Sequence, residues 1–81
     1  MFTKEAFKEY NDWFAVDVQM VDRIKTLLRD IDRDAFNGLG KPGPLKGDWK
    51  GYWSKRIDNE HRLIYKVSGT QILIPKCKGH Y

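Results

Sequence analysis

The chain has 81 residues, of which 41% are hydrophobic and 32% charged, so it is long enough for one domain and too short for two. It contains no apolar run near the roughly 20 residues of a membrane span, and no signal-peptide pattern at its start. Cys77 is its only cysteine, which excludes an internal disulfide and a cysteine metal site. We therefore expect one soluble domain over residues 1–81, in a reducing cytoplasm and without a membrane partner.

The formal charge of +4 is divided unevenly along the sequence. Residues 1–34 contain six Lys/Arg and eight Asp/Glu, a sum of −2, whereas residues 35–81 contain nine Lys/Arg and three Asp/Glu, a sum of +6. A cationic half that also carries aromatic residues favours a polyanionic partner, with RNA or DNA first. The same charges could also form an ordinary solvated surface.

The acidic half is predicted to form two helices. Thr3 is a suitable N-cap for the first helix and Asp17 for the second. Apolar residues follow each cap at helical spacing: Ala6, Phe7, Tyr10, Trp13 and Phe14, then Val21, Ile24, Leu27, Leu28 and Ile31. The regularity of the second stripe indicates core packing and not a cofactor site. The glycines and prolines of residues 37–46 should end the helical part.

The basic half is predicted to form three antiparallel strands, over residues 52–58, 61–67 and 71–77. Pro75 cannot donate a ladder hydrogen bond, so the last strand should lie at an edge or contain a bulge. Alternation puts Leu63 on the core face, and Arg62 and Lys66 on the opposite face, which Arg56 joins. The expected fold is therefore α+β, with two N-terminal helices on one face of a small antiparallel sheet and a cationic open face on the other.

The remaining polar residues suit cleavage of a phosphodiester by acid–base chemistry. No phosphate loop, serine-nucleophile elbow or cysteine–histidine metal spacing is present, so we expect no metal and no cofactor. An RNA 2′-hydroxyl can itself be the nucleophile, which leaves the protein to position the strand, move protons and stabilise charge.

Two residues are the main catalytic candidates. His80 can act as a general acid, because an imidazole titrates near neutral pH. Arg62 can stabilise charge on the phosphate through its guanidinium, although a surface ion pair with Glu60 or Asp58 is an alternative. His61 should point to the core side and have a structural role.

Further basic and aromatic residues could contact RNA. The candidates for phosphate contacts are Lys46, Lys50, Lys55 and Arg56. The candidates for stacking on bases are Trp49, Tyr52 and Tyr81. Trp49 and Tyr52 could equally pack in the core.

Four segments resemble the YoeB/Txe toxins of the RelE superfamily: GKPGPL (Gly40–Leu45), GYWSKRID (Gly51–Asp58), EHRLIY (Glu60–Tyr65) and KGHY (Lys78–Tyr81). The resemblance covers nearly the whole chain, although the N-terminal strand of the family is cut short here. It implies a RelE-like, microbial-RNase-like fold and a metal-independent endonuclease that cuts mRNA in the 30S A site of the ribosome by 2′-hydroxyl attack. It also implies a YefM/Axe-like antitoxin partner, and that homodimers are common.

The resemblance assigns roles to individual residues. The transition-state arginine of the family corresponds to Arg62, its general-acid histidine to His80 and its terminal tyrosine to Tyr81. Lys46 and Arg56 correspond to RNA-contacting positions.

One position departs from the family pattern. The family has K-P-E-P-L in the proline loop, where the glutamate is the general base, and this chain has Gly43 there. Losing a general base costs about 10²–10⁴-fold in rate. Glu60 is a possible substitute base. The leading hypothesis is therefore an mRNA endonuclease that Gly43 weakens or inactivates.

Two other functions remain open. The first alternative is a catalytically inactive module that still binds an antitoxin or the ribosome. The second is a DNA-binding protein, which the charge alone would allow. The positive charge lies on the strand half and not on a candidate recognition helix, which argues against DNA.

Overall fold

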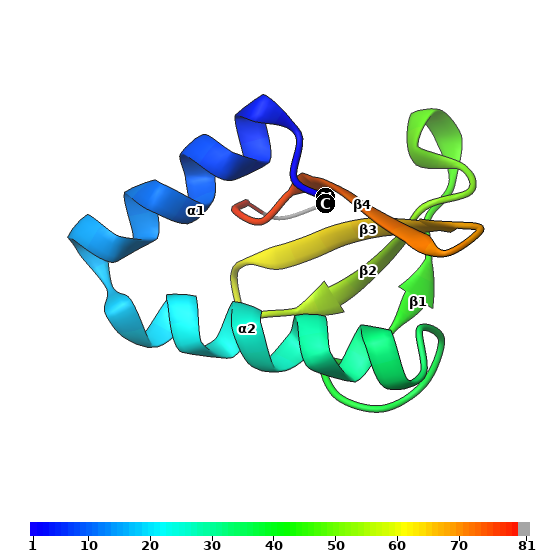
Figure 1. Ribbon diagram of the computed structural model, residues 1–81, viewed down its shortest axis with the longest axis horizontal. Helices are drawn as coiled ribbons and strands as arrows, with labels where there is room; N and C mark the ends of the chain where they lie inside the picture. Colours follow the sequence, from blue (N-terminus) through cyan, green and yellow to red (C-terminus); the bar gives the residue numbers. More distant parts are fainter. Residues whose placement is uncertain (80–81) are drawn as a thin grey trace.

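The computed structural model describes residues 1–79. Helices α1 (Lys4–Val16) and α2 (Val18–Arg33) are followed by strands β1 (Gly43–Pro44), β2 (Trp53–Arg56), β3 (Arg62–Ser68) and β4 (Gln71–Lys76), with a short 3₁₀ helix η1 (Gly47–Trp49) between β1 and β2. The two helices meet at an angle and lie against the four-stranded sheet (Figure 1). The expected α+β fold is confirmed.

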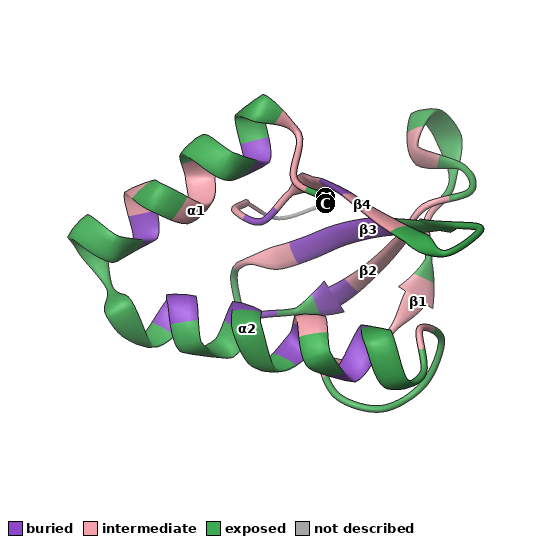
Figure 2. Ribbon diagram, in the orientation of Figure 1, coloured by how far each residue is buried: buried purple, intermediate pink, exposed green. Residues whose placement is uncertain are grey.

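Both helices begin at the predicted caps. The Thr3 side-chain oxygen accepts a hydrogen bond from the Ala6 N–H at 3.2 Å, and the Asp17 carboxylate accepts one from the Gln19 N–H at 3.0 Å. The buried residues of each helix face inward, toward the sheet (Figure 2). Phe7 and Phe14 are about half exposed, because only one side of α1 meets the sheet.

The sheet has the order β1-β2-β3-β4, and all its neighbouring strands are antiparallel. β1 is a strand that the sequence did not predict, since it lies inside the glycine- and proline-rich segment. It has only two residues, and it occupies an edge of the sheet, where the missing N–H of Pro44 costs no ladder bond.

A bulge lies near Pro75, as expected. The pairing of β3 with β4 shifts register between Ile64 and Lys66. On the other side of β4, Phe2 forms a parallel bridge with Ile74. The Thr3 N–H donates to the Ile74 carbonyl at 3.0 Å, so the N-terminal segment extends the sheet beyond β4.

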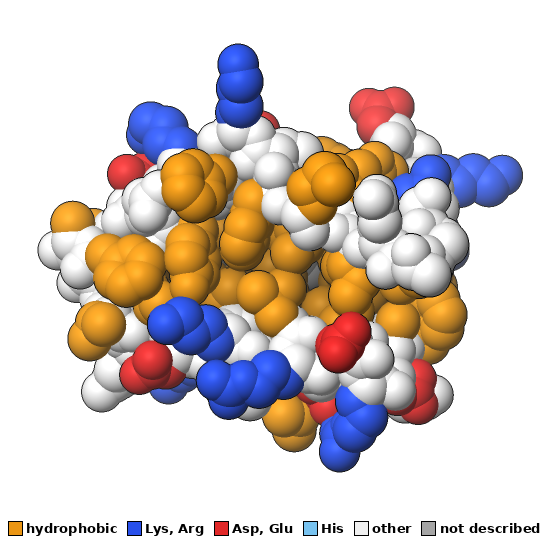
Figure 3. Space-filling model, in the orientation of Figure 1, with side chains coloured by type: hydrophobic (Ala, Val, Ile, Leu, Met, Phe, Trp, Pro, Cys, Tyr) orange, Lys and Arg blue, Asp and Glu red, His pale blue; other side chains and the backbone are white. Residues whose placement is uncertain are grey.

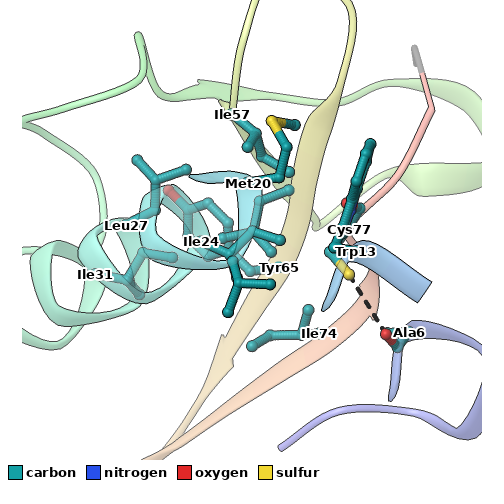
Figure 4. Close-up of a cluster of buried hydrophobic side chains, with 12 residues drawn as sticks. Ala6, Trp13, Met20, Ile24, Leu27, Ile31, Ile57, Tyr65, Ile74 and Cys77 are labelled. Atoms are coloured by element: carbon teal, nitrogen blue, oxygen red, sulfur yellow. Dashed lines mark hydrogen bonds between the residues drawn. The ribbon is translucent and has the colours of Figure 1, made fainter. Parts of the chain in front are cut away.

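The core fills the space between the helices and the sheet (Figure 4). Leu63 and Tyr65 are fully buried in it, whereas Val67 is 37% exposed. Trp13 donates its indole N–H to the Cys77 carbonyl at 3.0 Å, and the Cys77 thiol donates to the Ala6 carbonyl at 3.3 Å. These contacts attach the segment after β4 to α1. Within residues 1–79, no helix has the length and apolar character that a membrane crossing would require.

Candidate functional site

The open face of the sheet is organised by strand register. Gly43 pairs with Ser54, which in turn pairs with Ile64, so these three residues form one row across β1, β2 and β3. Arg56 pairs with Arg62. Paired residues of antiparallel strands point to the same face, as do residues two apart along a strand. A side chain at position 43 would therefore lie on the face that carries Arg62.

Ile64 is an apolar residue on this face. It is fully buried but does not belong to the cluster between helices and sheet. The face that carries Arg62 therefore also includes a buried apolar residue, at the position between Arg62 and Lys66 where strand alternation puts Ile64.

The backbone at Gly43 leaves room for a side chain. A Cβ atom built there meets no atom of residues 1–79 within 4 Å, and the φ angle lies outside the left-handed region. Gly38 is different, because its φ is +91° and a Cβ there would lie 2.4 Å from a carboxylate oxygen of Asp30. Local packing thus requires glycine at position 38, and nothing in the structure explains glycine at position 43.

Arg62 is partly buried at the start of β3. Its guanidinium donates to the backbone carbonyls of Asp58 and His61, at 3.2 and 3.4 Å. The Asp58 carboxylate accepts the backbone N–H groups of Glu60 and His61, at 2.8 and 2.7 Å, and so closes the β2–β3 turn. Burial raises the pKa of Asp58, but these two hydrogen bonds, together with nearby positive charge, leave the pKa below its ordinary value.

The segment after β4 returns to the start of β3. The Arg62 N–H donates to the Gly79 carbonyl at 2.9 Å, and the Gly79 N–H donates to the Nδ1 atom of His61 at 3.0 Å. His61 also lies edge-on against Trp13, with ring centroids 4.8 Å apart, so its expected packing toward the core is confirmed. His80 and Tyr81 follow Gly79 directly and lie outside the described residues.

Glu60 is the most exposed acidic residue near Arg62. Its side chain is 78% exposed, and its Oε2 atom lies 3.6 Å from the Nε2 atom of His61. It belongs to the β2–β3 turn, two residues before Arg62, and lies outside the strands. No group of His, Cys, Asp and Glu suited to a metal ion occurs in the described part of the chain.

Three of the four predicted RNA-contacting residues are exposed. Lys46 and Lys50 flank η1 in the β1–β2 loop, and Arg56 ends β2. Arg56 also borders an open hollow beside α2.

Two aromatic residues accompany these cations. Trp49 packs edge-on against Tyr52, with ring centroids 5.3 Å apart. The Lys66 ammonium lies 5.4 Å from the centre of the Tyr52 ring. Both aromatic residues are partly buried, and they pack against each other outside the main core.

The predicted RNA contact at Lys55 is wrong for this fold. Lys55 is fully buried, and its ammonium donates to Asp30 at 2.6 Å and to the Asn37 carbonyl at 3.1 Å. It pairs with Leu63 across the sheet, which puts it on the core face. The same alternation that places Arg56 outward places Lys55 inward, so the signal was present in the sequence.

The partner of Lys55 could not be identified from the sequence. Asp30 lies on α2, and its carboxylate also accepts from Arg33 at 2.5 Å and from the Leu39 N–H at 2.8 Å. The pKa of Asp30 is lowered to about 2, mainly by the hydrogen bond from the Lys55 ammonium and next by the one from the Leu39 N–H. This network joins α2, β2 and the loop that leads to β1, and thereby helps to position Gly43.

Comparisons with known proteins cover nearly the whole chain. Residues 2–81 match the family described as the YoeB-like toxin of the bacterial type II toxin–antitoxin system. A protein named toxin YoeB from Streptomyces coelicolor is 48% identical over 80 residues, which are 99% of this chain and 95% of that protein.

Solved structures agree with this assignment. A YoeB/ParE toxin from Agrobacterium tumefaciens superposes with a TM-score of 0.96 at 44% identity, covering 100% of this chain and 96% of that one. A Staphylococcus aureus YoeB in complex with YefM gives 0.93 at 44% identity, covering 100% and 94%. A YoeB from the same organism has also been solved as a dimer.

Proposed function

This chain belongs to the YoeB-like toxins of bacterial type II toxin–antitoxin systems, and from that membership we propose that it binds messenger RNA in the ribosomal A site. Its active site would cleave RNA by attack of the 2′-hydroxyl on the adjacent phosphate. The main support is the geometry at the start of β3, where the Arg62 side chain lies on the face that position 43 shares and the Arg62 backbone N–H binds Gly79. Gly43 has no proton acceptor in its side chain, so cleavage is weakened or lost.

The proposed roles follow from the chemistry of each side chain. Arg62 stabilises the charge that develops on the phosphate, because a guanidinium binds phosphate oxygens through two parallel N–H groups. His80 protonates the leaving oxygen, and the neighbouring Tyr81 stacks on a base. Position 43 is where a general base would act.

Lys46, Lys50 and Arg56 are proposed to hold RNA phosphates. If so, ribosome binding should weaken steeply with salt, since each phosphate contact releases counterions. We expect Lys46→Gln with Arg56→Gln to reduce the slope of log K against log salt by about 1 per lost contact. Lys25→Gln, an exposed change on α2, should leave the slope unchanged.

Co-sedimentation with programmed ribosomes over a salt series measures this slope and tests the proposed function. A flat salt dependence would argue against binding through the cationic face. Duplex DNA of the same length as the message serves as the competitor for ribosome binding. Tighter binding to the duplex than to ribosomes would favour the DNA-binding alternative.

Glu60 is proposed to act as the substitute base for any cleavage that remains with Gly43 in place. Its carboxylate is exposed and lies on the turn beside Arg62. We expect Glu60→Gln to abolish any cleavage that the chain shows with Gly43 in place, as measured by primer extension on programmed ribosomes. Asp32→Asn, an exposed carboxylate change on α2, is the control. Unchanged cleavage in Glu60→Gln would exclude Glu60 as the base.

The second candidate function is a non-catalytic module that binds a YefM-like antitoxin or the ribosome. Gly43 favours it, and so does apolar surface that is available for a partner. Phe7, Phe14, Val16 and Val18 are each more than half exposed. Hydrophobic side chains gather over α1 and between the helices (Figure 3). An antitoxin segment or a second copy of the chain would bury this surface.

A further inference from the structure

The side chain of His61 holds the chain immediately before the proposed general acid. Its Nδ1 atom accepts the Gly79 N–H at 3.0 Å, while the Arg62 N–H donates to the Gly79 carbonyl at 2.9 Å. Both backbone polar groups of Gly79 are therefore bound by two consecutive residues. Gly79 has a φ of 101°, a conformation that favours glycine.

This attachment lies beyond the regular sheet. The β4 ladder ends at Lys76, after the bulge near Pro75. Cys77 is bound from α1, because its N–H donates to Glu9 and its carbonyl accepts the Trp13 indole. Gly79 is bound from the opposite direction, by the start of β3.

We infer that His61 is a positioning residue, whose Nδ1 atom fixes the backbone of Gly79, the residue directly before His80 in the sequence. The inference rests on the proposed function, because it concerns the general acid of that reaction. A displacement of about 1 Å in a catalytic group can cost about 10²-fold in rate. A side chain that holds the residue before His80 therefore affects catalysis without touching RNA.

The hydrogen bond also fixes the protonation state of His61. A nitrogen that accepts a hydrogen bond carries no proton, so the imidazole is neutral and its proton lies on Nε2. Protonation of Nδ1 would place a donor against the Gly79 N–H and break the contact. The attachment of Gly79 therefore requires an Nδ1 atom that carries no proton.

Charged groups surround His61 on several sides. On the β2–β3 turn, Glu60 lies 3.6 Å from Nε2, and the Asp58 carboxylate binds the His61 backbone N–H. From α1, the Glu9 carboxylate accepts the N–H of Cys77, the first residue of the tail, the segment that follows β4. In the tail, the Lys78 ammonium lies 5.3 Å from the Trp13 ring, whose edge contact with His61 is apolar. The guanidinium of Arg62 also donates to the His61 carbonyl.

Two substitutions separate the hydrogen bond from the packing of the ring. His61→Phe keeps an aromatic ring against Trp13 and removes the acceptor. His61→Asn places an amide oxygen near the position of Nδ1 and so keeps a hydrogen-bond acceptor there. Circular dichroism and thermal unfolding check that both variants are folded.

The first readout is nuclear magnetic resonance of the folded protein. We expect the ¹⁵N shifts of the His61 ring to report a proton on Nε2. The amide of Gly79 should exchange about fivefold faster in His61→Phe, by the usual contribution of one hydrogen bond, and at the parental rate in His61→Asn. A proton on Nδ1, or unchanged exchange in His61→Phe, would overturn the inference.

The second readout is cleavage on programmed ribosomes in a Gly43→Glu background. His61→Phe should lower kcat about 10-fold to 10²-fold with little change in KM, and His61→Asn should restore it. Equal kcat in the parent and His61→Phe would also overturn the inference.

The two readouts fail separately. If no variant cuts RNA, the proposed function fails, and with it the catalytic part of the role of His61. If the Gly43→Glu protein cuts RNA but the Gly79 amide exchanges equally fast with and without the His61 ring, the inference about His61 alone fails.

Discussion

Replacing Gly43 by glutamate is expected to raise the rate of ribosome-dependent mRNA cleavage by about 10²–10⁴-fold, the usual contribution of a positioned general base. The backbone can accept the change, since a Cβ atom at this position meets no atom of residues 1–79 within 4 Å. Strand register directs the new side chain to the face that carries Arg62. Primer extension on ribosomes programmed with a defined message measures the rate.

Gly43→Gln is the matched control for this experiment. Glutamine has nearly the size of glutamate and loses the same backbone freedom, but it cannot accept the proton. Cleavage in Gly43→Glu alone would support the family mechanism and identify Gly43 as the disabling residue. Equal cleavage in all three proteins would point to another base, with Glu60 first. If none of them cuts, the binding module becomes the better description.

Replacing Asp30 by asparagine is expected to lower the free energy of unfolding by about 3–5 kcal/mol, because the fully buried Lys55 ammonium loses its counter-charge. A small domain is stable by only about 5–15 kcal/mol, so the variant should be close to unfolding at 37 °C. Urea unfolding followed by tryptophan fluorescence measures the loss.

The matched variants are Lys55→Met and the double replacement. Lys55→Met leaves Asp30 with Arg33 and the Leu39 N–H as partners, so the free energy of unfolding should fall less than in Asp30→Asn. The double variant should lose less than the sum of the two single changes, because neither buried charge is left alone. Additive losses would show that the two residues do not form a coupled pair in solution.

The ion pair of Asp30 and Lys55 also predicts how the free energy of unfolding depends on pH. In the folded chain the pKa of Asp30 is lowered from 3.8 to about 2, mainly by Lys55. A lowered folded-state pKa means that the unfolded chain binds the proton more readily. The contribution of Asp30 is therefore complete above about pH 4 and is lost as the pH falls toward 2. The Asp30→Asn variant should not show this part of the loss of stability at low pH.

Local sequence patterns determined most of the fold. Thr3 and Asp17 were recognisable as caps, because a cap bonds to N–H groups only two or three residues away. The apolar stripes and the strand alternation identified the buried sides of the helices and the outward direction of Arg62. The hypothesis that Gly43 replaces a general base also came from the sequence, because it rests on the resemblance to the K-P-E-P-L motif.

Tertiary structure alone decided which distant residues meet. Lys55 faces inward by alternation, but its partner Asp30 is 25 residues away on a helix, and helix–sheet packing brings the two together. The contact of His61 with Gly79 depends on the bulge near Pro75 and on the path of the tail after β4. Local patterns fix which side of an element is buried, because they act over a few residues. Register and packing fix which side chains touch, because those depend on the whole chain at once.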